Sequence, residues 1–238
     1  MKNQYFGDIN DYRKYGLLRK LCETDVSANI CWMLTACTAR SDGRKTEYLN
    51  NDAKWRDYDS PLFDSLKEQV LVRRRRHVDC AENVNILPPS NFSFYRPILE
   101  DGNAKREAYF QEFISGSHCE DLLFFDPDNG LDVPSTPKGR KGSSRYLYRD
   151  ELCEMWRRTE SSILVYQHFP REKRGRFVNR IAENLLQRLG LSRVASLRTP
   201  HVVFFLLARG SKHQQLLTRA TKVENAWGEQ IKVLIHKR

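Results

Sequence analysis

Four side chains in the second half of the chain have types and spacing that suit acid–base chemistry. The stretch LLFFDPDNGLDV at 122–133 runs from four apolar residues directly into Asp126, Asp128 and Asn129, and a later apolar stretch ends in His168. Hydrolysis of an N-glycosidic bond passes through an oxocarbenium-like sugar, so it needs a carboxylate, a positioned water and a donor for the departing base. The sequence therefore predicts Asp126 as the leading catalytic acid and His168 as the donor to the base. We expect Asp128 and Asn129 to order the water or the sugar.

The acidic stretch also has a simpler interpretation as an ordinary turn. Asp-Pro-Asp-Asn-Gly is typical of an Asx-rich turn in which Gly130 supplies a positive φ, and such a turn needs no function. His168, taken alone, is a common kind of hydrogen-bonded structural histidine. Three acids around one turn repel one another, however, unless a cation or a reaction uses them. This repulsion favours a functional site.

Basic residues outnumber acidic ones, forty Lys and Arg against thirty Asp and Glu, and the formal net charge is +10. Such an excess favours a polyanionic partner, and nucleic acid is the commonest one. Two basic clusters, 138–145 and 171–176, each follow a predicted strand end. Lysine and arginine side chains in loops of this kind can reach phosphates. The sequence predicts nucleic-acid binding, with DNA favoured over RNA, through Lys138, Arg140, Lys141, Arg145 and Arg171.

An aromatic and polar segment near the N-terminus is a second candidate for the same site. Its sequence, NQYFGDINDYRKYG, is too polar for a core helix. It can line the pocket, or it can be a surface helix start that Asp8 or Asn10 caps, and both interpretations stay open. The predicted substrate-binding residues outside the basic loops are Tyr5, Phe6, Asp8, Asn10, Tyr166 and Gln167.

Apolar patterns that alternate between strand and helix periods predict the elements that must position these residues. Helices are expected at 12–22, 60–74, 103–115, 147–158, 171–190 and 212–227, and strands at 29–35, 83–89, 122–125, 162–168, 201–209 and 230–237. This alternation predicts one α/β domain over 1–238, with a Rossmann-like, mostly parallel sheet and helices on both faces. An antiparallel strand is possible at the C-terminal edge. If strands 122–125 and 162–168 are neighbours, their polar ends share one crevice.

Other features narrow the class of protein. No apolar window of ~18 residues and no apolar signal region occurs, which predicts a cytoplasmic protein. The six cysteines form no CxxC pair and show no zinc-type spacing, so we expect reduced, mostly buried thiols. We predict no cofactor and no bound metal.

Three resemblances rest on the acidic stretch and on the strand end at His168. FFDPDNGLD resembles the calcium-binding loop of nucleoside hydrolases and the DxD turn of haloacid-dehalogenase-type phosphatases, so whether a divalent ion binds this loop stays open. FDPDNG followed by QHFPREKRGRF resembles the Asp-Pro and His-Pro motifs of the uracil-DNA glycosylase superfamily. That resemblance implies a parallel α/β sheet, a water-positioning role for Asp126 and stabilisation of the departing base by His168.

A broader resemblance covers most of the chain. YFGDINDYRKYGLLRKL, NICWMLT, SDGRKTEYL, FFDPDNG and LVYQHFPR are similar in order to the layout of bacterial ribosomal RNA adenine methyltransferases. Those enzymes have glycines after the first strand and an Asp-Pro-Pro-Tyr clamp, where this chain has ACTARSDG and Asp128-Asn129. Our primary hypothesis is a DNA glycosylase-like enzyme. The alternatives are an S-adenosylmethionine-dependent nucleic-acid methyltransferase and a non-catalytic nucleic-acid-binding protein on that scaffold.

Overall fold

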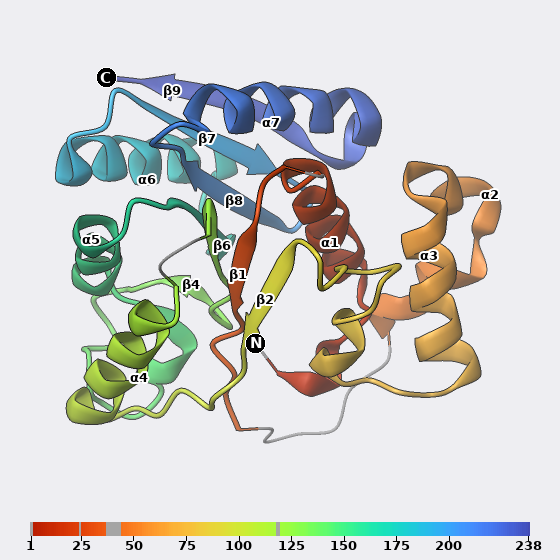
Figure 1. Ribbon diagram of the computed structural model, residues 1–238, viewed down its shortest axis with the longest axis horizontal. Helices are drawn as coiled ribbons and strands as arrows, with labels where there is room; N and C mark the ends of the chain where they lie inside the picture. The colour runs from red at the N-terminus through yellow and green to blue at the C-terminus, as the bar shows by residue number, and fades with distance from the viewer. Residues whose placement is uncertain (1, 24, 37–43, 118–119) are drawn as a thin grey trace.

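The protein folds around one seven-stranded sheet. The computed structural model describes residues 2–23, 25–36, 44–117 and 120–238. The strand order is β2-β1-β3-β6-β8-β7-β9 (Figure 1). The strands are β1 (Ala28–Cys31), β2 (Phe92–Tyr95), β3 (Leu122–Phe125), β6 (Ser162–His168), β7 (Arg193–Arg198), β8 (Val202–Leu207) and β9 (Lys232–Lys237). Strands β2, β1, β3 and β6 pair in parallel, whereas β8, β7 and β9 pair antiparallel. Five of these seven strands therefore point the same way, which confirms the predicted α/β, Rossmann-like class.

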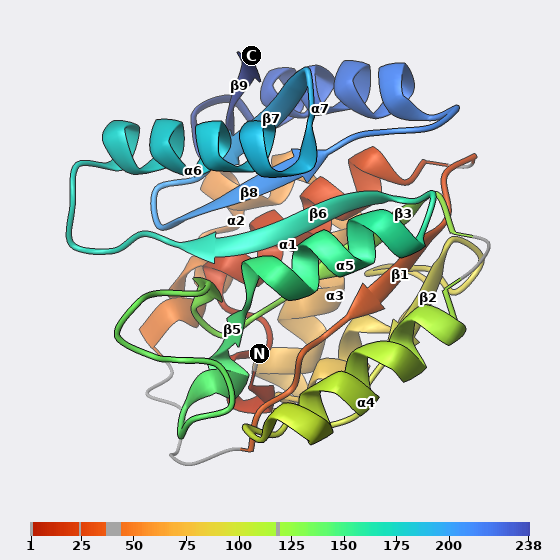
Figure 2. The same ribbon diagram turned by 90° about the vertical axis from the view of Figure 1, so that its left-hand side faces the viewer.

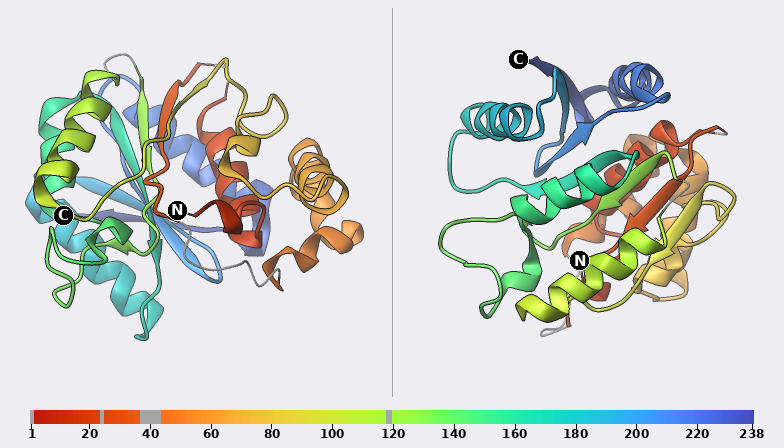
Figure 3. Two further views of the ribbon diagram at one scale, coloured as in Figure 1. Left: turned by 90° about the horizontal axis from the view of Figure 1, so that it is seen from below. Right: turned by 60° about the vertical axis from the view of Figure 1, so that its left-hand side comes forward.

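Helices cover both faces of the sheet. One face carries α1 (Ile9–Leu21), α3 (Ser60–Lys67) and α7 (His213–Trp227), and the other carries α4 (Asn103–Ser115), α5 (Arg149–Arg158) and α6 (Arg174–Leu189) (Figure 2). A short helix, α2 (Asp52–Trp55), precedes α3. Each face has its own buried apolar cluster, and the two views in Figure 3 show α1 and α4 on opposite sides of β1. No described helix is long and apolar enough to cross a membrane.

The sheet has a switch point between β1 and β3. The chain leaves β1 and returns as β2 on one side of it, then crosses through α4 and returns as β3 on the other side. In open α/β sheets, ligands bind beyond the carboxyl ends of the strands at such a point. Asp126 follows β3 directly, and its backbone N–H donates to the Cys31 carbonyl at the end of β1. The acidic stretch therefore begins at the switch point.

Two features of the predicted elements are wrong. The expected strand at 83–89 is a turn, because the N–H groups of Ile86 and Leu87 donate back to Asn83 and Ala81 instead of to a neighbouring strand. Two prolines follow, and proline cannot donate to a ladder. The true second strand, β2, begins three residues after Pro89. The sequence also missed β7, whose ends are both exposed arginines.

The described cysteines agree with the sequence. Cys22, Cys31, Cys80 and Cys153 are free and buried. The remaining two, at 37 and 119, lie outside the described residues. The predicted reduced, buried thiols are confirmed for these four positions.

The absence of a side chain at Gly16 allows α1 to pack closely against Trp227 of α7. This close packing predicts the effect of a substitution on stability. A Cβ at Gly16 would lie 1.9 Å from a ring carbon of Trp227. Gly16→Ala is expected to lower the free energy of unfolding by ~1–3 kcal/mol because the buried ring must move. Gly175 in α6 has nothing within 4 Å of such a Cβ, so Gly175→Ala is the matched control. The control should raise stability by up to ~1 kcal/mol, since alanine is the better helix former. Urea unfolding of both variants measures the difference, and equal stabilities would contradict the close packing of α1 on α7.

Candidate active site at the carboxyl ends of β3 and β6

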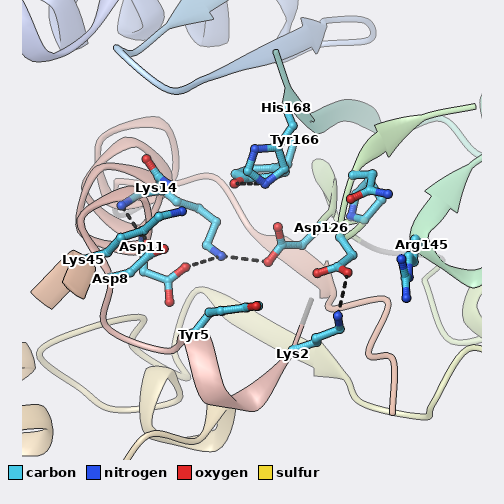
Figure 4. Close-up of a pocket in the computed structure, with 14 residues that line it drawn as sticks. Lys2, Tyr5, Asp8, Asp11, Lys14, Lys45, Asp126, Arg145, Tyr166 and His168 are labelled. Carbon is cyan, nitrogen blue, oxygen red and sulfur yellow. Dashed lines mark hydrogen bonds and ion pairs between the residues drawn. The ribbon is translucent and has the colours of Figure 1, made fainter. Parts of the chain in front are cut away.

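A polar pocket of about 370 Å³ lies beyond the carboxyl ends of β3 and β6, and we name it the β3 pocket. Its size is within the ~300–1,000 Å³ typical of small-molecule sites. It is lined by Lys2, Tyr5, Asp8, Asn10, Asp11, Lys14, Lys45, Asp126, Pro127, Asp128, Asn129, Arg145, Tyr166 and His168 (Figure 4). The N-terminal segment and α1 form one wall, and the ends of β3 and β6 form the other.

Lys14 forms the centre of the pocket floor. Its Nζ lies 2.7 Å from Asp11 Oδ1 and 2.7 Å from Asp126 Oδ2, and all three side chains are buried (Figure 4). The same Nζ lies 5.1 to 5.7 Å from the ring centres of Tyr15, Trp32 and Tyr166. Burial alone would lower the pKa of Lys14, but the attraction of Asp11 and Asp126 outweighs it and raises the pKa. Lys14 is therefore a fixed ammonium at neutral pH.

The first turn of α1 brings a third carboxylate to the floor. Asp8 is the N-cap residue of α1, and its Oδ1 accepts from the backbone N–H groups of Asn10 and Asp11. Burial raises the pKa of Asp8, although these bonds and Lys14 oppose the rise. Burial favours the neutral form of Asp8, so the floor has two carboxylates, on Asp11 and Asp126, against the one ammonium of Lys14.

Asn10 presents an unused acceptor at this floor. The side chain is 3% exposed, and Asn10 Oδ1 has no hydrogen-bond partner among the described residues. Buried polar atoms are nearly always hydrogen-bonded in folded proteins, so an orphan deserves an explanation. A bound ligand that donates a hydrogen bond to Asn10 Oδ1 would explain why this buried oxygen has no partner among the described residues.

The rim of the pocket carries the opposite charge. Lys2 Nζ lies 3.3 Å from Asp128 Oδ2 across the mouth, and Lys45 and Arg145 are exposed there. Tyr5 is 38% exposed beside them. A ligand with a cationic part and an anionic part can therefore place the first on the floor and the second at the rim.

His168 is neutral at the pH of most cells. Burial lowers its pKa, and Lys45 adds to that effect, while Asp128 and Asp126 oppose it. The His168 Nε2 and the Tyr166 hydroxyl lie 3.1 Å apart (Figure 4). A neutral imidazole can accept a proton or donate one N–H, and Tyr166 fixes the orientation of the ring.

A second pocket adjoins the first on the other face of the sheet edge, and we name it the α6 pocket. Its volume is about 480 Å³. Beside α6, its walls include a small two-stranded ribbon of β4 (Gly130–Leu131) and β5 (Tyr146–Leu147). Asn129 and His168 line both pockets. The two pockets therefore meet at a shared wall.

The structure brings together most of the residues that the sequence singled out. All four predicted catalytic side chains line the β3 pocket, as do five of the predicted substrate-binding ones. These nine are Asp126, Asp128, Asn129, His168, Tyr5, Asp8, Asn10, Tyr166 and Arg145. The parallel pairing of β3 with β6 is the cause, since it places both strand ends at one edge.

Two of the predicted substrate-binding residues, Phe6 and Gln167, do not line the β3 pocket because their side chains are occupied elsewhere. Phe6 is 0% exposed and packs beside Tyr15 in the core. Gln167 lines only the α6 pocket, and its amide bonds three backbone groups: it accepts from Leu131 N–H and donates to the Asn129 and His168 carbonyls. The Gln167 side chain also packs closely against Gly130, because a Cβ at Gly130 would lie 2.4 Å from it. Gly130 has a φ of +109°, which other residues rarely adopt.

The basic loops lie outside the β3 pocket, apart from Arg145. Lys138 pairs with Asp150 at 2.7 Å and faces α5. Arg140, Lys141 and Arg171 are exposed and line neither pocket. Their predicted contact with nucleic acid stays a prediction.

Five pocket residues were not among the predicted site residues, although the second and third lie in the N-terminal segment that can line the pocket: Lys2, Asp11, Lys14, Lys45 and Pro127. Asp8, Asp11 and Lys14 follow one another at a spacing of three in the sequence. Residues three apart lie on one face of a helix, so this spacing was a usable signal. In the described part of the chain, no group of three or more His, Cys, Asp or Glu side chains is arranged to hold a metal ion.

The carboxylate cluster gives a prediction about pH. Burial raises the pKa of Asp11 to about 6, against the opposing effect of Lys14. The folded chain then holds a proton that the unfolded chain releases, so this contribution to stability is lost as pH rises from about 4 to 6. Asp11→Asn removes the titration, and the difference in unfolding free energy between wild type and variant should change by ~2–3 kcal/mol across that window. Urea unfolding at pH 4.5, 5.5 and 7 measures it, and a constant difference would contradict the raised pKa.

Comparisons with known proteins show only distant likenesses. No family model matches the chain, and no curated protein matches it. One similar solved structure is protein LPL1258 from Legionella pneumophila, described by the family model DUF519, with 9% identity, a TM-score of 0.46, and coverage of 98% of this chain and 97% of that one. Another is human methyltransferase-like protein 13 in complex with SAH, with 11% identity, a TM-score of 0.33, and coverage of 90% and 88%. At these identities and TM-scores, neither likeness supports an inference about function.

Proposed function

We propose that this chain is an S-adenosylmethionine-dependent methyltransferase that acts on nucleic acid. The observation that carries the proposal is the pair of pockets that meet at Asn129 and His168. Transfer of a group between two bound molecules requires two adjoining sites, because the reacting atoms must approach to ~3–3.5 Å. Hydrolysis requires one site and a water.

The β3 pocket suits the methyl donor. When bound, S-adenosylmethionine supplies a methyl group on a cationic sulfonium: the acceptor's lone pair forms the new bond to carbon, the carbon–sulfur pair stays on sulfur, and the acceptor's proton leaves. The excess of carboxylates at the floor attracts a cation, and Asn10 Oδ1 is an unused acceptor for a hydroxyl or amine. Lys45 and Arg145 at the rim suit the donor's carboxylate.

The backbone at the end of β1 has a conformation that the sequence did not reveal. Met33 is buried and has a φ of +45°. A non-glycine residue in this region is strained, and such strain concentrates at functional sites. This turn follows the strand after which the resembling methyltransferases have glycines, although Met33 itself lines neither pocket; Gly43 lies outside the described residues.

The strand order agrees with the proposal at the level of fold. Strands β2, β1, β3 and β6 form a parallel half with a switch point, and the β7–β8 hairpin places β8 antiparallel between β6 and β7. A mostly parallel α/β sheet is the layout that the resemblance to methyltransferases implies. Fold alone does not determine function, so this agreement supports the proposal only as an analogy.

The residues at and beside the shared wall suit an acceptor nitrogen, since Asn129 and His168 line both pockets and Asp126 and Asp128 lie beside them in the β3 pocket. Positive charge develops on a nitrogen as it gains a methyl group, and the carboxylates of Asp126 and Asp128 stabilise that charge. Neutral His168 is placed to receive the proton that the nitrogen loses. These roles use the same residues that the sequence predicted, for a different reaction.

The exposed basic loop gives a prediction about nucleic acid. Arg140 and Lys141 are exposed and have no ion pair among the described residues, whereas Lys138 pairs with Asp150. The double variant Arg140→Ala and Lys141→Ala should weaken binding and reduce the slope of log affinity against log salt by ~1 for each lost phosphate contact. Lys138→Ala is the control and should change the slope less. The slope is obtained from binding to a labelled single strand at salt concentrations between about 50 and 300 mM, where the salt effect is large. An unchanged slope in the double variant removes this loop from the interface.

Isothermal titration with S-adenosylmethionine tests the donor site directly. Wild-type protein should bind it, and Asn10→Leu should bind it ~10-fold more weakly, the effect of one lost hydrogen bond of ~1.4 kcal/mol. Inorganic triphosphate is the control ligand, since the floor carboxylates repel it and it has no base that could bind elsewhere on the chain. No binding of S-adenosylmethionine, or equal binding of triphosphate, would overturn the donor assignment.

N-glycosidic hydrolysis is a second candidate, because Asp126, Asp128, Asn129 and His168 do lie together in one pocket. A carboxylate near the sugar, an amide and a neutral imidazole are the groups that this reaction needs. Lys14 Nζ, 2.7 Å from Asp126, weakens this charge equally for hydrolysis and for transfer, so the contact does not separate the two reactions. Incubation with normal and modified nucleic acids, followed by cleavage of abasic sites, separates the two candidates: abasic products support hydrolysis, and their absence with methylated product supports transfer.

A further inference from the structure

We propose that the α6 pocket binds a single unstacked nucleobase, with its phosphates outside on the arginines of α6. Nucleotide binding there is independent of the proposed function; only the role of this base as methyl acceptor rests on it. The pocket is less polar than the β3 pocket, and its walls come from β4, β5, the end of β6 and α6.

Aromatic side chains form a stacking surface in this pocket. Phe169 and Phe177 pack edge to face with ring centres 6.1 Å apart, and Tyr146 lines the pocket as well. Leu131 and Ile181 complete the apolar part. Single-stranded nucleic acids bind proteins by stacking bases on such rings, and every base has a π-face to offer. A planar ring is therefore the ligand shape that this pocket fits.

Asn129 offers the pocket an unused amide. In the described part of the chain, the Asn129 side chain makes no hydrogen bond, although its backbone N–H and carbonyl are both bonded. A side-chain amide has donors and an acceptor side by side, which match the donor–acceptor pattern of a base edge. Gln167 has the same group but uses it on three backbone groups, so it cannot replace Asn129. Asn129 thus faces the base edge at the wall shared with the β3 pocket.

The acidic side chains that line the α6 pocket are neutralised by arginines, so the pocket does not favour a cation. Both acids in its lining are already paired: Asp132 with Arg149 at 2.8 Å, and Glu172 with Arg180 at 3.0 Å.

Next to the pocket, the first turn of α6 and the segment before it carry exposed cations. Arg171 and Arg176 are exposed and have no ion pair among the described residues. Arg174 lies over the Phe169 ring, 5.3 Å from its centre. Cations beside a stacking surface are the arrangement that holds a backbone phosphate while the base enters a pocket.

This arrangement selects an unpaired nucleotide. A base inside a duplex is stacked on both faces and paired along its edge, so it reaches a walled pocket only after extrusion. The Asn129 amide and the Phe169 ring would compete with pairing and stacking for the same surfaces. We therefore expect a single-stranded or extruded nucleotide to bind more tightly than the same nucleotide within a duplex.

Titration of the whole chain with each of the four ribonucleoside 5′-monophosphates, without methyl donor, tests the site. At least one should bind, and Phe169→Ala should weaken it by ~5–150-fold, the effect of losing one stacking ring. Asn129→Ala should weaken it too, and its fold should be intact because the side chain has no hydrogen-bond partner among the described residues. Tyr5→Ala is the matched control, since Tyr5 lines only the β3 pocket, and it should leave nucleotide binding unchanged.

The outcomes separate this site from the proposed function. If no nucleotide binds, or if Tyr5→Ala weakens binding while Phe169→Ala and Asn129→Ala do not, the α6 pocket is not a nucleobase site. If S-adenosylmethionine fails to bind but the nucleotide binds and responds to Phe169→Ala and Asn129→Ala, the site stands and the proposed function fails. Displacement of the nucleotide by S-adenosylmethionine in the Tyr5→Ala variant would also overturn the two-site arrangement.

Discussion

Asp126→Asn is expected to slow methyl transfer by at least ~100-fold, the effect of removing one group that stabilises charge in a transition state. Asp126 is 2% exposed at the end of β3, next to the wall that the two pockets share. Asparagine keeps the volume and can still accept a hydrogen bond from Lys14, which also retains Asp11 at 2.7 Å. The fold should therefore persist, and affinity for nucleic acid should be kept or slightly raised because one negative charge is lost.

Asp128→Asn is the matched control for this prediction. Asp128 lies at the mouth of the pocket, where its side chain is 14% exposed and faces Lys2. Its loss should slow the reaction less than the loss of Asp126, because water screens a charge at the rim. Single-turnover rates with saturating donor and acceptor compare the two variants. A folded Asp126→Asn variant that works at the wild-type rate would remove this carboxylate from the mechanism.

Lys14→Met is expected to lower the free energy of unfolding by ~3–5 kcal/mol at pH 7, the cost of removing one partner from a buried ion pair. Two buried carboxylates, on Asp11 and Asp126, then lose their common cation. The pKa of Asp11, which burial already raises, must rise further in the folded variant, so the folded state takes up a proton that the unfolded state does not. By linkage, the loss of stability should shrink as pH falls.

Lys67→Met tests whether burial is the cause. Lys67 pairs with Asp52 at 2.6 Å, but both side chains are at least a third exposed. Exposed pairs contribute ~0–1 kcal/mol, so this variant should be nearly as stable as wild type at every pH. Urea unfolding of both variants at pH 5 and pH 7 gives the comparison. Two results would contradict the proposed role of burial. One is an equal and small decrease in the free energy of unfolding in both variants, and the other is a decrease in Lys14→Met that grows as pH falls.

The sheet was predictable because its central strands are buried on both faces. LLFF at 122–125 and SILVYQH at 162–168 read as near-continuous apolar runs, which is typical of parallel strands under helices. The strand at 83–89 was wrong because apolar residues also fill turns beneath the sheet: Ile86 and Leu87 are buried without joining a ladder. Apolar content alone does not separate these two cases.

The part of the site formed by neighbouring strand ends was predictable from the sequence. The part formed by α1 and the N-terminal segment was only partly predictable. Asp126 and His168 meet because their strands are parallel neighbours. The contact from Lys14 to Asp126 joins residues 112 apart in sequence, and it depends on how α1 packs over the switch point. Local pattern contains no information about that packing. The same limit explains Phe6, whose neighbour Tyr5 lines the pocket while Phe6 lies in the core.

The choice between hydrolysis and transfer could not be made from the residues alone. Both reactions develop positive charge, and both use carboxylates, an amide and an imidazole. What separates them is the second pocket, whose walls come from β4, β5 and α6. Strand β4 lies within the acidic stretch, but its pairing with β5 and its place beside α6 depend on the tertiary structure. The catalytic side chains could be identified from the sequence. The second pocket, which favours a reaction between two bound substrates, became visible only in the tertiary structure.

Transfer of a radiolabelled methyl group from S-adenosylmethionine is the most direct test of that preference. Wild-type protein is incubated with the labelled donor and a panel of single-stranded and duplex DNA and RNA, and both the label in nucleic acid and the abasic sites are counted. We predict label in at least one single-stranded nucleic acid, at least ~100-fold less with Asp126→Asn, and no abasic sites. Abasic sites formed without the donor, with no label in any nucleic acid, would contradict methyl transfer and restore hydrolysis as the function of this pocket.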